Sequence, residues 1–80
     1  MKRQLELIFP ERLVTRPVIY ELSRRYPLVV FNIRRAKVTE KTGELVLELS
    51  AKKELLDKAI KWLKKKGIII NSVDADVLAG

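Results

Sequence analysis

The sequence predicts an α+β fold whose elements follow one another in the order β-α-β-β-α-β. Apolar and polar residues alternate over four short segments, which indicates strands, and apolar residues recur at helical spacing over two other segments. Proline or glycine lies at several of the expected boundaries, where these residues interrupt regular structure. The composition does not change along the 80 residues, so we expect one domain over residues 1–80.

The first strand and the first helix are expected on either side of Pro10. Residues 4–9 alternate in polarity, and one face of the strand carries Leu5, Leu7 and Phe9. Thr15 is placed to cap the helix, and Pro17 is tolerated in its first turn because an N–H there has no helical partner. Pro27 ends this helix.

The second strand, residues 28–38, is the segment around which we arrange the rest of the chain. Its apolar residues lie in two opposite phases: Val29, Phe31 and Ile33, then Ala36 and Val38. A β-bulge near Arg34 and Arg35 reconciles the two phases, because one extra residue shifts the register. A turn that ends at Gly43 leads into a third strand at 44–50, so we expect a hairpin.

The second helix is expected from a cap at Ser50 to about Lys66, with Gly67 as its terminator. Three consecutive lysines in its last turn suit the negative end of the helix dipole. Residues 68–70 are the expected fourth strand. Apolar residues alternate in the tail at Val73, Ala75 and Val77, so the strand can extend through them.

This order is the split arrangement of the ferredoxin-like fold, a four-stranded antiparallel sheet with two helices on one face. Right-handed crossovers give the strand order 4-1-3-2, which leaves the second strand as an open edge. On the uncovered face each strand offers one apolar residue: Ile8, Val30, Val46 and Ile69. An apolar stripe and an open edge both favour self-association, so we expect a homodimer with these residues at its interface. Scattered surface aliphatic residues are the alternative.

The chain contains neither cysteine nor histidine, which excludes thiol chemistry, the usual zinc ligands and the usual general base. Asp74 and Asp76 alone are too few ligands for a cation. We therefore expect no enzyme activity, catalytic residue, metal or cofactor. No apolar run is long enough to cross a membrane, so we expect a cytoplasmic protein.

The net charge is +7, from 17 basic and 10 acidic residues. This excess favours nucleic acid or another anionic surface, although it is also typical of the charged surface of a thermophilic protein, which is the interpretation we prefer. RNA recognition on an open sheet face needs outward aromatic residues on the central strands. Phe9 is in the inward phase there, so nucleic-acid binding ranks below the two hypotheses that the family resemblance supports, although above an enzyme.

Several segments together resemble the NIL domain, a ferredoxin-like and ACT-like module named after an Asn-Ile-Leu motif on its second strand. They are residues 17–22, Tyr26, residues 30–38, Gly43, residues 45–49, residues 59–63 and Gly67. In methionine ABC importers the family's domain ends the ATPase subunit, binds methionine and inhibits transport. In NIL–ferredoxin proteins it precedes cluster-binding cysteines, and some of those proteins assist homocysteine-forming sulfurtransferases.

The resemblance places the family motif at Asn32, Ile33 and Arg34, with arginine where the family has leucine. It implies that Asn32 contacts a ligand, and an outward amide suits both the carboxylate and the ammonium of an amino acid. Arg34 is able to pair a carboxylate, and Ile33 is expected in the core or in an apolar pocket wall. The first hypothesis is therefore a non-enzymatic regulatory module that binds methionine or a related amino acid at a dimer interface. The second is an accessory subunit that docks on a partner enzyme, a sulfurtransferase, or on a transporter subunit.

Overall fold

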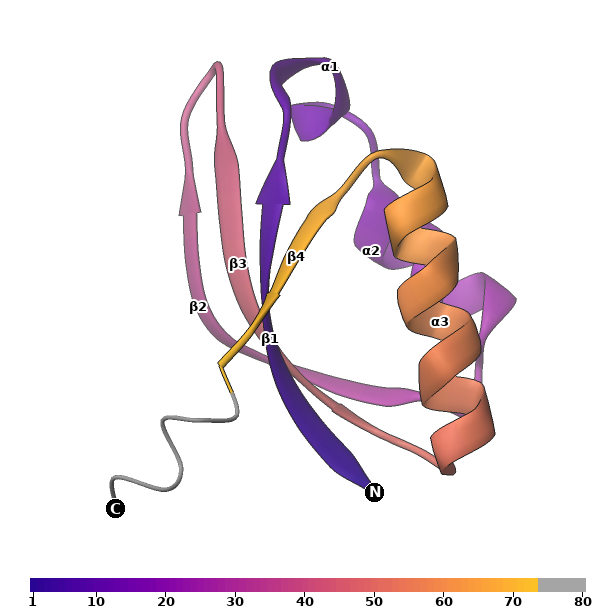
Figure 1. Ribbon diagram of the computed structural model, residues 1–80. Coiled ribbons are helices and arrows are strands. Elements are labelled where there is room, and N and C mark those ends of the chain that lie inside the picture. Colours follow the sequence, from indigo (N-terminus) through magenta and orange to yellow (C-terminus); the bar gives the residue numbers. More distant parts are fainter. Residues whose placement is uncertain (74–80) are drawn as a thin grey trace.

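The predicted element order is confirmed in the computed structural model, which describes residues 1–73 (Figure 1). The strands are β1 (Lys2–Phe9), β2 (Val30–Val38), β3 (Gly43–Ser50) and β4 (Ile69–Ser72). The helices are α1 (Glu11–Val14), α2 (Val18–Arg25) and α3 (Lys53–Lys66). The sequence pattern indicates a loop where the structure has α1. Four residues are too few to show a helical period, so this helix could not be recognised from the sequence.

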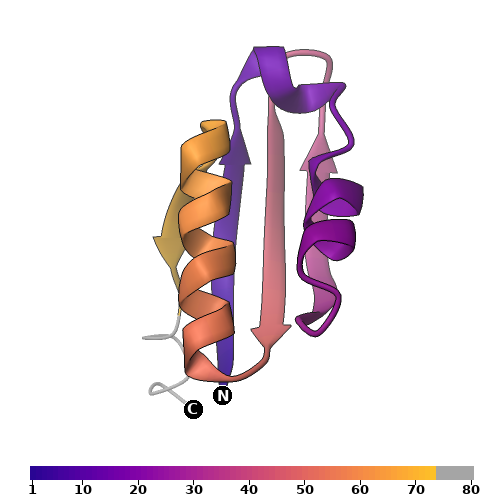
Figure 2. The ribbon, with the colours of Figure 1, turned by 90° about the vertical axis from the view of Figure 1, so that its right-hand side faces the viewer.

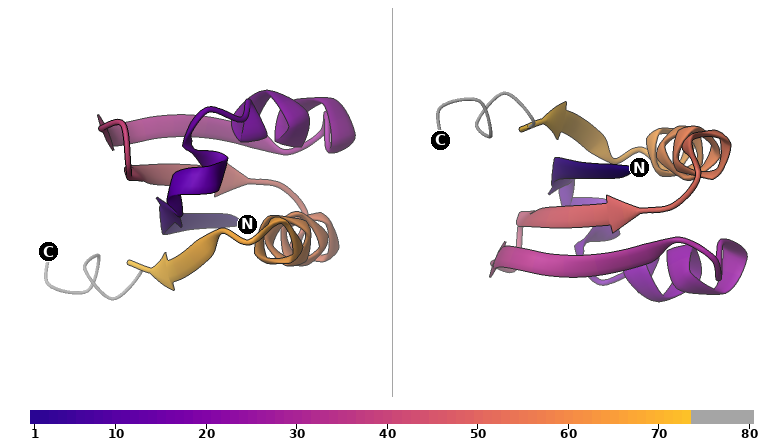
Figure 3. Two further views of the ribbon diagram at one scale, coloured as in Figure 1. Left: turned by 90° about the horizontal axis from the view of Figure 1, so that it is seen from above. Right: turned by 90° about the horizontal axis from the view of Figure 1, so that it is seen from below.

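The four strands form one antiparallel sheet in the order β2-β3-β1-β4, which is the predicted order read from the other edge. Both long helices lie on the same face of the sheet, and α1 lies at one end of it (Figure 2). Views from above and below show α2 and α3 on one side of the stacked strands (Figure 3). The ferredoxin-like α+β class is thereby confirmed, with β2 and β4 as the two edges.

The core lies between the sheet and the two long helices. Alternate residues of β1 and β3 point toward the helices, and residues three or four apart on α2 and α3 point back toward the sheet. The largest side chains with less than 2% exposure are Leu7, Val18, Leu22, Leu47, Leu49, Leu56 and Leu63. Burial of each contributes roughly 1.5–3 kcal/mol, so this layer holds both helices on the sheet.

The predicted end of α3 is confirmed, whereas the predicted helix starts are wrong. Gly67 has a φ of 105° and its N–H donates to a carbonyl oxygen of the last turn at 3.0 Å. Ser50 belongs to β3, and Lys52 occupies the N-cap position of α3. Thr15 follows the end of α1, and Pro17 precedes α2. Neither start has a side-chain cap, so burial of the apolar faces decides where these helices begin.

A β-bulge interrupts β2 at the predicted place. Ile33 pairs with Leu47 and Arg35 pairs with Val46, so Arg34 is the extra residue. The bulge reverses the alternation of the strand. As a result, its second half presents apolar residues to the same side as the first half, and the helix-side residues beyond Phe31 are Ile33, Ala36 and Val38.

Within residues 1–73, no helix is long and apolar enough to span a membrane, and no three acidic side chains gather as a metal site. Asp74 and Asp76 lie outside the described residues, as does the expected strand extension through Ala75 and Val77.

Candidate functional site at the edge strand

The strand β2 is an edge whose outer side faces no other strand of the described chain. Of its nine residues, only Phe31 is partly buried and the rest are exposed. Its large apolar side chains are among the most exposed in the structure: Val30 at 67%, Ile33 at 51% and Val38 at 63%. An open strand edge with exposed apolar side chains is a surface that pairs with another chain.

The three residues of the expected ligand site lie side by side in the chain but face different ways. Asn32 pairs with Glu48 and is exposed on the face without helices. Ile33 points to the helix side, where we expect it to be buried, but it is half exposed. Arg34, at the bulge, lines a hollow of about 350 Å³ on the uncovered face together with Arg35. The polar pair Asn32 and Arg34 therefore shares one face, and Ile33 lies on the other.

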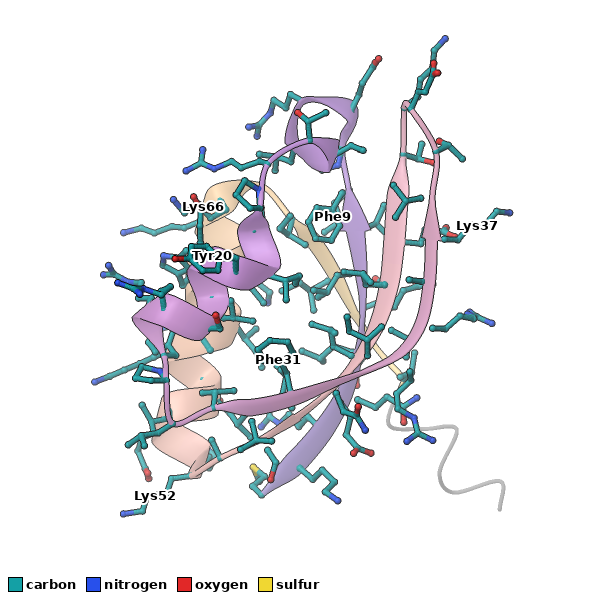
Figure 4. All side chains as sticks on the ribbon, turned by 180° about the vertical axis from the view of Figure 1, so that it is seen from behind. Phe9, Tyr20, Phe31, Lys37, Lys52 and Lys66 are labelled. Carbon is teal, nitrogen blue, oxygen red and sulfur yellow. The ribbon has the colours of Figure 1, made fainter. Side chains whose placement is uncertain are left out.

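Helix length explains the exposure of Ile33. The eight residues of α2 span about 12 Å, whereas the nine residues of β2 span about 30 Å. Val29, before the strand, is 4% exposed and Phe31 packs against the core, but the helix does not reach the rest of β2. Figure 4 shows Phe31 directed between the layers and Lys37 directed away from the helices.

The structure brings together only part of the apolar stripe expected on the uncovered face. Ile69 pairs with Ile8. Val46 lies one diagonal step away and is 8% exposed, because it sits between its partners Glu6 and Arg35. Val30 pairs with Ser50, and the row that contains Asn32 and Glu48 separates it from Val46. The face is a short apolar cluster within a charged surface, and its role as an interface stays a prediction.

An apolar groove on the helix side adjoins β2 and was missed in the sequence. It has a volume of about 200 Å³, and its walls include Phe9, Ile19, Tyr20, Val38 and Leu45. Arg16 at its rim is held by Glu21, with Nε 3.2 Å from Oε1. On β2, the phase of Val38 after the bulge is the sequence signal that places an apolar side chain here.

The fold and the site define a class: a small ferredoxin-like domain with one uncovered sheet face and one open strand that carries both polar and apolar side chains. The family model of the NIL domain matches residues 3–71, so the chain belongs to the NIL domain family. The sequence matches none of the curated proteins with which it was compared.

Among solved structures, the chain is similar to the C-terminal domain of an ABC transporter ATP-binding protein from Enterococcus faecalis. The TM-score is 0.75 at 18% sequence identity, and the match covers 90% of this chain and 83% of that one. At this identity the likeness shows a shared fold.

Proposed function

We propose that this NIL domain is a non-enzymatic regulatory module that binds methionine or a closely related amino acid where two copies meet along β2. The observation that carries the proposal is the open, almost fully exposed edge of β2, which bears Asn32, Ile33 and Arg34, the residues that resemble the family motif. The similarity to a domain of an ABC transporter ATP-binding protein supports a role alongside a transporter ATPase.

Two copies of β2 can pair in antiparallel fashion about a two-fold axis, which extends the sheet from four strands to eight. Arg34 is the middle residue of Val30–Val38, so pairing centred there brings both copies of the motif together. Asn32 and Arg34 then make the polar contacts to the ligand on the uncovered face, and Ile33 supplies an apolar wall on the other side.

The charge of β2 couples the ligand to the dimer. The strand carries three cations and no acid: Arg34, Arg35 and Lys37. The ion pairs found within residues 1–73 involve other cations, so pairing two copies brings like charges together. The bound amino acid is a zwitterion, and its carboxylate offsets this repulsion when it lies nearer the arginines than its ammonium does, so ligand and dimer stabilise each other.

Amide chemical shifts of isotopically labelled protein test the site directly. Titration with methionine is expected to give saturable changes centred on residues 30–36, and Asn32→Ala is expected to weaken binding at least about tenfold, the loss of one strong polar contact. Homocysteine, cysteine and leucine in parallel titrations define the selectivity for the thioether.

Asn71→Ala is the matched control, because Asn71 is an exposed amide on the opposite edge strand and donates to Glu6 at 3.2 Å. Its variant keeps wild-type affinity if the site is at β2. A spectrum that stays silent at millimolar methionine removes the amino-acid role, and equal losses in both variants remove Asn32 from the site.

A further inference from the structure

A second surface, remote from the motif, gathers positive charge and aromatic rings where α2 ends beside α3. The two helices lie side by side over the sheet (Figure 2), and a groove of about 550 Å³ runs between them. We call this surface the helix groove; its walls are Arg25, Tyr26, Lys58, Lys61, Trp62, Lys64 and Lys65. Arg24 and Lys66 lie with Trp62 on the adjoining side, together with Glu21, which is paired with Arg16.

Within residues 1–73, no acidic side chain forms an ion pair with a cation of the helix groove. The ion pairs of that range use the cations Lys2, Arg3, Arg16 and Lys53. From position 58 to the end of α3 the helix contains no acid at all. The helix dipole accounts for cations in a last turn, but Lys58 and Lys61 lie one to two turns earlier. Like charges from two helices therefore converge without an ion-pair partner, and such a patch attracts anionic ligands.

The aromatic rings of the helix groove are fixed in place. Trp62 and Tyr26 are partly buried and meet edge to face, with ring centroids 6.3 Å apart and planes at 74°. The ammonium of Lys66 lies 5.1 Å from the centre of the Trp62 ring, and Tyr20 beside it is 61% exposed. Figure 4 shows Tyr20 and Lys66 close together on this side of the molecule. Rings held among cations form a platform on which a flat group can stack.

We propose that the helix groove binds single-stranded nucleic acid. Lys58, Lys61 and Lys65 follow one another along α3 at axial spacings of about 4.5 and 6 Å, so they are able to contact successive phosphates of an extended strand. The bases then stack on Trp62 and Tyr26. The uncovered sheet face is a poor alternative, because Phe9 and Phe31 point to its helix side.

The shape of the helix groove argues against other anionic partners. A lipid surface is contacted by protruding apolar side chains, whereas Trp62 is partly buried and lines a groove. An acidic peptide gains from the lysines but has no group that requires two adjoining rings. Stacking and phosphate binding together select a strand of nucleotides.

Trp62 is the single tryptophan of the chain, so its fluorescence reports on the helix groove alone. Addition of a ten-nucleotide oligouridylate or oligothymidylate to the full chain is expected to quench this fluorescence saturably. The logarithm of the affinity is expected to fall linearly with the logarithm of the salt concentration. Uridine monophosphate and phosphatidylserine vesicles are titrated in parallel.

Two triple variants with the same loss of charge localise the site. Replacing Lys58, Lys61 and Lys65 by Gln is expected to weaken binding at least about tenfold and to flatten the salt slope by about 2, since each contact contributes about 0.7 for single strands. Replacing Lys37, Lys41 and Lys52 by Gln removes equal charge from the hairpin and the far end of α3, and is expected to change the affinity less than about threefold.

Four results overturn the proposal. Equal losses in both triple variants mean that net charge alone attracts the strand. The absence of quenching by either oligonucleotide at low salt removes nucleic acid as the ligand. Equal affinity for the mononucleotide makes this a small-nucleotide site. Binding to vesicles without binding to the oligonucleotides assigns the surface to a lipid headgroup.

Discussion

Two glycines illustrate how backbone geometry constrains single residues in this domain. A Cβ added at Gly43 meets the Cβ of Phe9 at 3.4 Å, an ordinary contact. At Gly67, where φ is 105°, an added Cβ meets the guanidinium of Arg12 and lies 3.4 Å from Leu13 Cδ1. The carbonyls at the end of α3 accept hydrogen bonds only if the chain turns here in the left-handed conformation, which a side chain disfavours.

Gly67→Ala is therefore expected to lower the free energy of unfolding by about 1–2 kcal/mol, the cost of a side chain in left-handed backbone. Gly43→Ala, its control, is expected to stay within about 1 kcal/mol of the wild type because its conformation and its space both admit a Cβ. Urea unfolding followed by circular dichroism measures both values. Equal destabilisation in the two variants would contradict this assignment.

Residues whose role depends on local conformation were predictable from the sequence, and those whose role depends on packing were not. Gly67 needed only a break in the pattern to be placed, whereas Gly43, expected in the turn, is the first residue of β3 and does not have a positive φ. The half-exposed state of Ile33 depends on the length of α2, which ends at Arg25. Thr15 and Ser50 have the chemistry of caps, but Thr15 is the C-cap of α1, and two more residues follow Ser50 before α3 begins at Lys53.

At the scale of elements, β2 is the strand whose pattern carries the most information. Ile33 and Ala36 are three residues apart, so a regular strand would point them to opposite faces. Both can face the core only if one extra residue lies between them, so the bulge follows from the sequence. The site around it does not follow, because alternation assigns residues to faces without saying which part of a face a helix covers. The apolar groove beside Val38 lies where no helix covers the inner face of β2.

Deletion of Arg34 tests the bulge. Without it Ile33 still pairs with Leu47 and Arg35 still pairs with Val46, so the ladder becomes regular and no side chain changes face. We expect the free energy of unfolding to stay within about 1 kcal/mol of the wild type, as for other surface changes. Chemical denaturation measures it, and amide chemical shifts locate any change of register.

Deletion of Lys37 is the comparison for this experiment. If the bulge is kept, Val38 moves to the uncovered face. If the strand becomes regular instead, an arginine moves to the helix side. This variant is expected to be clearly less stable than the Arg34 deletion. A larger loss on deleting Arg34 would mean that the bulge itself stabilises the sheet.

At the scale of the whole molecule, the charge excess is unevenly distributed. One concentration lies along β2 and another in the helix groove, and opposite faces of the domain carry them. The sequence revealed the total of +7 but not this division, since Arg25 and Lys58 are brought to one groove only by the packing of α2 and α3. The two surfaces can therefore be tested separately.

Self-association along β2 is expected to strengthen with salt, because the paired edges carry only positive charge. Raising salt from 0.1 to 1 M shortens the screening length from about 10 to 3 Å, which weakens repulsion between exposed cations and leaves apolar contacts intact. Methionine is expected to raise the dimer fraction as well, and more strongly at 0.1 M, where its carboxylate offsets more repulsion. Sedimentation velocity at several protein concentrations measures both effects.

Removing the β2 charges separates this mechanism from a general effect of net charge. The double variant of Arg34→Gln and Arg35→Gln is expected to dimerise at low salt and to lose most of its salt dependence, because the repulsion between paired edges is then small. The double variant of Lys64→Gln and Lys65→Gln loses the same charge on α3 and is expected to keep the wild-type salt dependence. A dimer that weakens with salt would mean that ion pairs hold the copies together, and a single-chain mass under every condition would remove the β2 interface altogether.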